Sequence, residues 1–168
     1  MKFKKHILLI LSLLASMSLF SENQNFKSDS IEERKVYREA ITSFRNAEYL
    51  NAIKFFQKSL SYNIKLYGKK SVKTGNSYNA LGITYRNIGN YDSSLKYFEL
   101  AEEAYLAKVD QNEIPIARLY SNIGNVYLSS LNFGIAIDFY QRAASLFQEN
   151  QHNNQQDIHG KTRPVYGC

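Results

Sequence analysis

A repeat of 42 residues runs through the middle of this chain and limits what it can fold into. Shifting the sequence by 42 aligns Tyr78, Leu81, Gly82 and Tyr85 with Tyr120, Ile123, Gly124 and Tyr127. The same shift aligns Tyr91, Ser94, Leu95, Phe98 and Ala101 with Phe133, Ala136, Ile137, Tyr140 and Ala143, and an earlier copy holds Tyr49, Ala52, Ile53, Phe56 and Ser59. Because the matches recur at spacings of three and four, each copy is predicted to be helical and to bury one face against its neighbour.

Each copy is predicted to be two helices joined by a short turn, covering about residues 30–67, 72–108 and 115–150. The turns of the second and third copies are expected at Gly89-Asn90 and near Leu131-Asn132. Ser30 and Glu33 have the spacing of a capping box that begins the first pair. Gly68 suits the end of that pair, and Pro115 suits the first turn of the third. Gly82 and Gly124 are expected where a partner helix crosses closely. The fold class is therefore all-α, a stack of three helix hairpins.

The repeated motif resembles the tetratricopeptide repeat. It appears as Tyr78-x-x-Leu81-Gly82-x-x-Tyr85 with Ser94-x-x-x-Phe98, and as Tyr120-x-x-Ile123-Gly124-x-x-Tyr127 with Ala136-x-x-x-Tyr140. The length of 42 looks like the variant of kinesin light chains. Tyr stands in place of Trp, Ser94 in place of Ala, and the closing Pro is missing. The resemblance implies a right-handed α-solenoid of three repeats over 30–150 that binds protein or peptide.

The two ends of the chain are predicted to lie outside this array. Residues 1–21 have a basic start followed by an apolar run of 14 residues, Ile7 to Phe20. That run is shorter than the roughly 20 residues of a membrane-spanning helix and fits a signal peptide, cleaved after Ser18 or Ser21. The chain is therefore expected to be periplasmic or extracellular, and an uncleaved N-terminal membrane anchor is the alternative. Residues 22–29 are predicted to be a linker, and 151–168 a disordered polar tail.

Catalytic residues are not apparent in the repeats. The three histidines are His6, His152 and His159, and the single cysteine is Cys168, so residues 22–150 contain neither type. The paired acids Glu32-Glu33 and Glu102-Glu103 point about 100° apart on a helix, which favours solvated helix faces over a carboxylate dyad. His152 and His159 are too far apart in a polar segment to predict a metal site. The chain is expected to be no enzyme and to need no cofactor.

The charge of the chain says less about its partners than the repeat motif does. The formal net charge is +6, and three of the basic residues, Lys2, Lys4 and Lys5, belong to the predicted signal peptide. Nucleic acid is therefore not an expected partner. Lys65, Lys69, Lys70 and Lys73 form a cluster that fits an anionic surface or, as the simpler interpretation, a solvated turn.

An inner groove lined by the first helix of each pair is the predicted binding site. Steps of three and four from the core positions give Asn76, Asn79, Ile83, Arg86, Arg118, Asn122, Asn125 and Leu128, with Ser121 on the same face. Asn side chains donate and accept, so the row is predicted to hold a peptide backbone, with Arg86 and Arg118 selecting a carboxylate. An exposed helix face without a ligand is the alternative.

Two further expectations concern partners. In tetratricopeptide co-chaperones that grip a terminal carboxylate, the matching positions are Tyr37, Ile41, Ala80, Arg118 and Asn122 here, and only Arg118 is basic, so that mode is not expected. The last pair has no capping helix after it, so Ile137, Tyr140, Ala144 and Phe147 are predicted to be partly uncovered. A self-assembling protein that forms a homodimer through this last repeat is therefore the alternative function.

Overall fold

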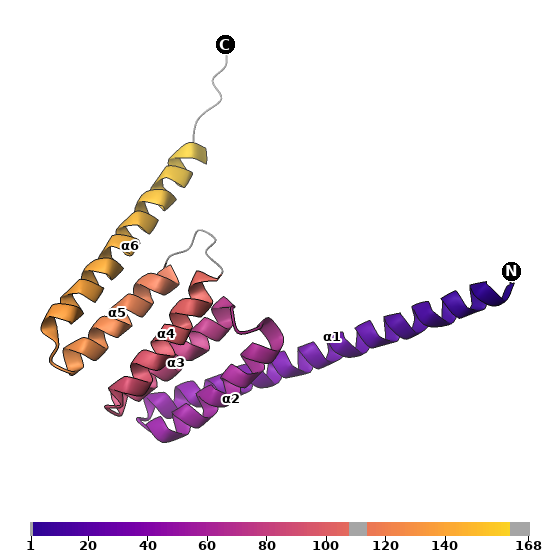
Figure 1. Ribbon diagram of the computed structural model, residues 1–168, viewed down its shortest axis with the longest axis horizontal. Coiled ribbons are helices and arrows are strands. Elements are labelled where there is room, and N and C mark those ends of the chain that lie inside the picture. Colours follow the sequence, from indigo (N-terminus) through magenta and orange to yellow (C-terminus); the bar gives the residue numbers. More distant parts are fainter. Residues whose placement is uncertain (1, 108–113, 162–168) are drawn as a thin grey trace, which may run out of the picture.

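The computed structural model describes the backbone of residues 2–107 and 114–161 and the side chains of 14, 16–107 and 114–151. Within these residues every element is a helix and no strand occurs, as predicted. The helices are α1 (Lys2–Arg45), α2 (Tyr49–Tyr67), α3 (Val72–Asn87), α4 (Tyr91–Leu106), α5 (Ile114–Ser129) and α6 (Phe133–Lys161). They pack as three hairpins, α1 with α2, α3 with α4, and α5 with α6 (Figure 1).

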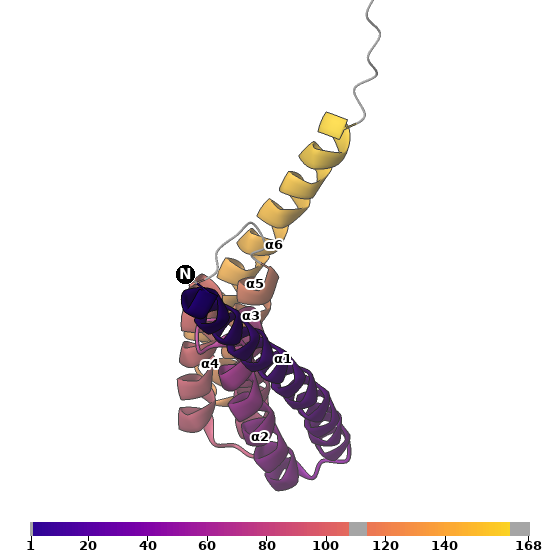
Figure 2. The same ribbon diagram turned by 90° about the vertical axis from the view of Figure 1, so that its right-hand side faces the viewer.

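The repeat in the sequence is reproduced by the helix boundaries. The second helices α2, α4 and α6 begin at Tyr49, Tyr91 and Phe133, and α3 and α5 begin at Val72 and Ile114, always 42 residues apart. The hairpins stack side by side in chain order, as the two views together show (Figures 1 and 2). The first junction is the contact between the first and second hairpins. The second junction is the contact between the second and third hairpins.

The turn inside each hairpin has one residue with a left-handed backbone. These residues are Ala47, Gly89 and Leu131, with φ of 60°, 75° and 63°. Glycine adopts this conformation without strain, whereas alanine and leucine do not. The turns predicted at Gly89 and Leu131 are therefore confirmed, and three different residues occupy the same geometry.

Glycine allows the two helices of the second and third hairpins to approach closely. A Cβ atom at Gly82 would lie 2.4 Å from the ring of Phe98, and one at Gly124 would lie 2.8 Å from the ring of Tyr140. Phe98 is fully buried and Tyr140 is half-buried. The close crossing predicted at both glycines is confirmed.

The predicted start of the first hairpin at Ser30 is wrong. Helix α1 is continuous through the interval 22–29 and through Ser30. The Glu33 side chain does not reach back to form a capping box, because its Oε1 accepts hydrogen bonds from α2, from Ser59 Oγ at 2.7 Å and Asn63 Nδ2 at 3.1 Å. A tertiary contact has replaced the local one.

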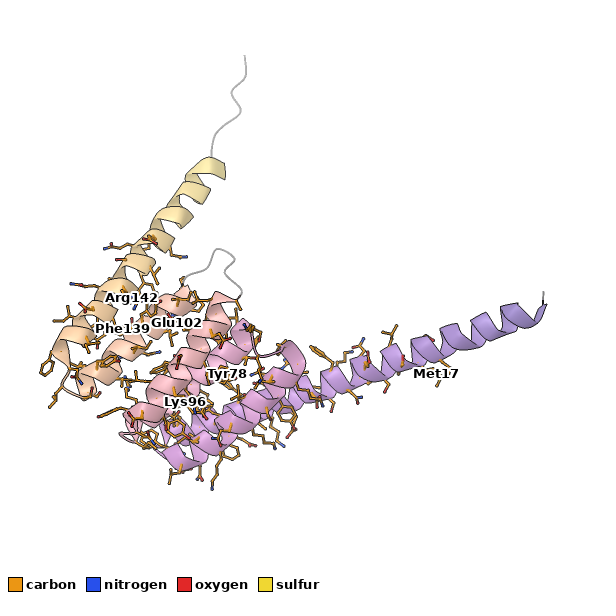
Figure 3. The ribbon with its side chains drawn as sticks, in the orientation of Figure 1. Met17, Tyr78, Lys96, Glu102, Phe139 and Arg142 are labelled. Carbon is orange, nitrogen blue, oxygen red and sulfur yellow. The ribbon has the colours of Figure 1, made fainter. Side chains whose placement is uncertain are left out.

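The folded body begins near Phe26. The Phe26 ring packs edge-on against Tyr67 at 6.0 Å, and Asp29 Oδ2 lies 2.6 Å from Lys65 Nζ. Before this point α1 extends away from the hairpins, and Met17 on that part is 68% exposed (Figure 3). In the described part of the chain, no helix combines the length and the apolar character needed to cross a membrane.

The last hairpin is longer than predicted. Helix α6 does not end by Gln151 but continues to Lys161, so the segment predicted to be disordered from 151 is helical as far as that residue. Extending an existing helix adds one hydrogen bond per residue without a new nucleus, which lets a polar sequence follow on. Residues 162–168 of the predicted tail lie outside the described residues.

Candidate peptide-binding groove

The first helices of the three hairpins border one hollow of about 350 Å³. It is lined by Tyr37, Ile41, Phe44, Phe56, Asn76, Asn79, Ala80, Ile83 and Arg118. We call this hollow the inner groove. Four of the eight residues predicted for the binding site lie in its lining: Asn76, Asn79, Ile83 and Arg118.

Helical spacing explains why these residues meet. Asn76, Asn79 and Ile83 are three and four residues apart, so they share the face of α3 opposite its buried residues. Arg118 is exposed near the start of α5. The groove therefore has an amide wall on α3 and one cation on α5.

The other four predicted residues do not line the inner groove. Arg86 donates to the side chain of its neighbour Asn87 at 3.4 Å. Asn122 Nδ2 donates to Asn79 Oδ1 at 3.0 Å, and Asn125 Oδ1 accepts from the Tyr140 hydroxyl at 2.7 Å. Leu128 is exposed near the end of α5.

Three of the predicted asparagines use their side-chain oxygen to accept a hydrogen bond within the protein. Asn79 Oδ1 and Asn125 Oδ1 do so as described above, and Asn76 Oδ1 accepts from the Tyr105 hydroxyl at 2.8 Å. The Nδ2 groups of Asn76 and Asn79 donate no hydrogen bond within the described residues. The groove therefore offers amide donors, which suit the carbonyl groups of a ligand, rather than the mixed donors and acceptors predicted.

The sequence prediction missed the contribution of α1. Tyr37, Ile41 and Phe44 line the groove, and they stand 42 residues before Asn79, Ile83 and Arg86. Applying the period to the predicted residues themselves would have found all three. Tyr37, Ile41 and Ala80 also occupy positions where a carboxylate-gripping co-chaperone is polar or basic, so the wall here is apolar instead.

Arg118 is the charged residue in the groove lining. Burial, and secondly the nearby Glu33 carboxylate, raise the pKa of Tyr37 above its ordinary value. Burial also raises the pKa of Tyr105, against a smaller lowering effect of Arg118. Both phenols are neutral at pH 7, so Arg118 sets the electrostatic preference of the groove for an anion.

The lysine cluster is partly paired. Lys65 contacts Asp29, and Lys70 Nζ lies 3.2 Å from Glu103 Oε1. Partners within the protein weaken the case for an anionic surface at this site.

The end of the last hairpin is only partly as predicted. Ile137 is 54% exposed, whereas its counterpart Ile53 in the first hairpin is 7% exposed. Tyr140, predicted to be partly uncovered, is half-buried, because its ring packs on Gly124 and its hydroxyl donates to Asn125 Oδ1.

No group of three or more His, Cys, Asp or Glu side chains forms a metal site among the described residues. His152 and His159 lie outside the described side chains.

Comparison with known proteins agrees with the fold of stacked helix hairpins. The sequence model of the tetratricopeptide repeat family matches residues 32–107. Residues 32–107 of the chain therefore contain tetratricopeptide repeats. Tetratricopeptide repeats generally mediate protein–protein interactions.

A solved structure shares the fold of this chain. It is the crystal structure of BtubC (BKLC) from P. vanneervenii, with a TM-score of 0.63 and 18% sequence identity. The match covers 70% of this chain and 47% of BtubC, so the chain spans about half the length of that protein. No curated protein matches the sequence.

Proposed function

We propose that this protein is an exported, non-catalytic adaptor that holds a peptide segment of a partner protein in the inner groove. In this proposal the three hairpins wind as a right-handed solenoid. The observation that carries it is the convergence of α1, α3 and α5 on a single hollow with an apolar wall and one cation. Repeat stacks of this kind use such concave surfaces for binding.

The groove lining suggests the chemistry of the ligand. Tyr37, Ile41 and Phe44 provide an apolar wall for one large side chain. The Asn76 and Asn79 amides donate to peptide carbonyl groups, and Arg118 pairs with a carboxylate close by. A segment with an acidic residue beside an apolar one satisfies all three elements.

Binding without catalysis is supported by the sequence of the folded part. Residues 22–150 contain no His and no Cys, which removes the commonest general base and the thiol nucleophile from the hairpins. No cofactor is part of the proposal.

Export is supported by the position at which the body begins. Phe26 and Asp29 on α1 contact Tyr67 and Lys65 on α2, a few residues after the predicted signal peptide 1–21. Its removal would therefore leave the packed part of α1 whole. The alternative is that these residues stay as an N-terminal anchor.

A fusion of residues 1–30 to alkaline phosphatase, which is active only outside the cytoplasm, tests export. We expect activity from the fusion and loss of it when Leu11 and Leu14 are both changed to Arg. Processing then separates release from anchoring, since a cleaved fusion is shorter and soluble. An inactive fusion would contradict export.

Peptide selection tests the groove. We expect random peptides selected on the full chain to share a carboxylate beside an apolar residue. Arg118→Glu should weaken a selected peptide about tenfold or more, whereas Arg45→Glu, an exposed change outside the groove, should not. Selected peptides that bind Arg118→Glu as tightly as the wild type would contradict the proposal.

Self-assembly through the last hairpin is the second candidate, and the exposure of Ile137 favours it. Light scattering on the full chain in mild detergent distinguishes the two. A dimer that Ile137→Glu converts to a monomer would support self-assembly. A monomer across the concentration range would eliminate it.

A further inference from the structure

A second hollow, of about 500 Å³, lies at the second junction between α4 and α6, with α5 below it. Its less exposed lining is formed by Leu95, Ile123, Tyr127 and Phe139, and its polar lining by Asp92, Lys96, Glu99, Glu102 and Arg142. We call it the second-junction cleft. Lys96 and Glu102 lie on α4 and Phe139 and Arg142 on α6, on either side of the cleft (Figure 3).

The period shows why the second junction is open here. Moving back 42 residues from Glu102 and Arg142 leads to Leu60 and Leu100, at the first junction. Both leucines pack against the hydrophobic core. At equivalent positions, two apolar side chains therefore close the first junction, whereas two charged side chains line the second junction.

The three carboxylates that line the second-junction cleft have no charged counterparts at the first junction. The carboxylates Asp92, Glu99 and Glu102 replace Leu50, Gln57 and Leu60, which are neutral. Lys96, by contrast, repeats Lys54. The chain has thus added three carboxylates at this one junction while carrying a net positive charge overall.

One positive charge of the cleft is held within the protein. The Arg142 guanidinium lies 4.1 Å from the centroid of the Tyr120 ring and 5.2 Å from that of Phe139. The Tyr120 hydroxyl donates to Glu102 Oε1 at 2.7 Å, so Glu102 and Arg142 are fixed on the same ring. Asp92, Lys96 and Glu99 form no ion pair within the described residues. The remaining local charge is negative.

The floor of the cleft is suited to an apolar side chain. Tyr127 and Phe139 stack with their centroids 5.6 Å apart and their planes 10° apart. Leu95 and Ile123 complete the surface. A ring or branched side chain on this floor removes apolar area from water, which is the usual source of peptide affinity.

We infer that the second-junction cleft is a second docking site, and that it binds a basic segment of a partner protein with a lysine or arginine beside a large apolar residue. The cation pairs with the exposed Glu99 carboxylate, and the apolar residue lies on Tyr127 and Phe139. The two sites prefer opposite charges, since Arg118 gives the inner groove its cation. The inference stands independently of the inner groove, because it uses no residue of that site.

Peptide titration followed by NMR tests this inference. The probes are a nonapeptide with a central lysine flanked by leucine and phenylalanine, and the same peptide with glutamate for lysine. On the full chain in mild detergent, the lysine peptide should shift the amide signals of Lys96, Tyr127 and Phe139. It should bind about tenfold more tightly than the glutamate peptide.

Matched variants decide the result. Glu99→Lys, an exposed change in the cleft, should weaken the lysine peptide about tenfold. Glu149→Lys, an exposed change on α6 outside it, should have no effect, and neither should Arg118→Glu in the inner groove. Absence of shifts at the three cleft residues, equal binding of the two peptides, or equal weakening by Glu149→Lys would each overturn the inference.

Discussion

At the first junction the buried side chains Asn63 and Ser77 hydrogen-bond to each other at 2.8 Å, whereas the equivalent positions of the second junction hold Tyr105 and Leu119. Nearer the surface the order is reversed. There the first junction has Leu60 and Leu100, and the second has Glu102 and Arg142.

The repeat therefore fixes where a side chain lies but not its polarity. The first junction is polar inside and apolar outside, and the second is apolar inside and polar outside. One consequence is that the first junction depends on a buried hydrogen-bond network, while the second keeps an open cleft. Variants at Asn63, at Glu102 with Arg142, and at Tyr105 test this difference, and variants at the crossing glycines and the turn residues test how the hairpins themselves differ.

The largest expected loss of stability comes from filling the close helix crossings inside the second and third hairpins. Gly82→Val should lower the free energy of unfolding by about 3 kcal/mol, because the new side chain meets the fully buried Phe98 ring, which cannot move aside. Gly124→Val should cost less, about 1–2 kcal/mol, because Tyr140 is half-buried and can yield. Urea unfolding measures both. Gly134, with open space around it, is the control, and equal losses at Gly82 and Gly124 would contradict the difference in packing.

The buried network of the first junction gives the next effect. Asn63→Ala should lower the free energy of unfolding by about 2 kcal/mol, because Ser77 and Glu33 lose their donor inside the protein. Asn51→Ala is the control on the same helix, since the hydrogen bond of Asn51 to Glu48 is exposed. A loss no larger than that of the control would show that the network is not a source of stability.

Placing the outer residues of the first junction at the equivalent positions of the second junction should increase stability. Glu102→Leu combined with Arg142→Leu should raise the free energy of unfolding by about 1 kcal/mol, because leucines cover the ring floor. The same double variant should no longer bind the lysine peptide. A fall in the midpoint of urea unfolding would contradict the comparison.

The left-handed turn residues predict smaller effects. Leu131→Gly should raise the free energy of unfolding by about 1 kcal/mol, and Gly89→Ala should lower it by a similar amount, because only glycine adopts this backbone without strain. Thermal unfolding of both variants measures the pair. Equal shifts in the same direction would show that the two turns differ in geometry.

Alkaline pH tests the apolar interior of the second junction. Burial raises the pKa of Tyr105 in the folded protein above its ordinary value near 10. Above that value the unfolded chain releases a proton that the folded chain keeps, so the contribution of Tyr105 to the free energy of unfolding falls as pH rises beyond 10 and is constant below it. Tyr105→Phe should make this fall shallower. An unchanged slope would show that Tyr105 is accessible to water.

Much of the fold could be predicted from the sequence because the 42-residue repeat determines where each helix, turn and helix crossing lies. The spacing predicted the hairpins, the turns at Gly89 and Leu131, and the close crossings at Gly82 and Gly124. The packed part of α1 begins before the predicted Ser30 because Phe26 and Asp29 contact residues of α2, which are far away in the sequence. A local capping signal at Ser30 cannot show such contacts.

The inner groove was predicted in part. Helical spacing predicted Asn76, Asn79, Ile83 and Arg118 for the inner face, and all four line the hollow. It did not show that asparagine oxygens would bond to Tyr105 and Asn122, because side-chain partners on other helices depend on packing.

The measurement that tests the central claim most directly is methyl NMR on the full chain with a peptide selected on it. If the three hairpins form one concave binding site, the methyl signals of Ile41 on α1 and Ile83 on α3 shift together at the same peptide concentration, and Arg118→Glu raises the concentration needed for both shifts about tenfold or more. Saturating peptide that leaves both isoleucines unmoved would contradict the account.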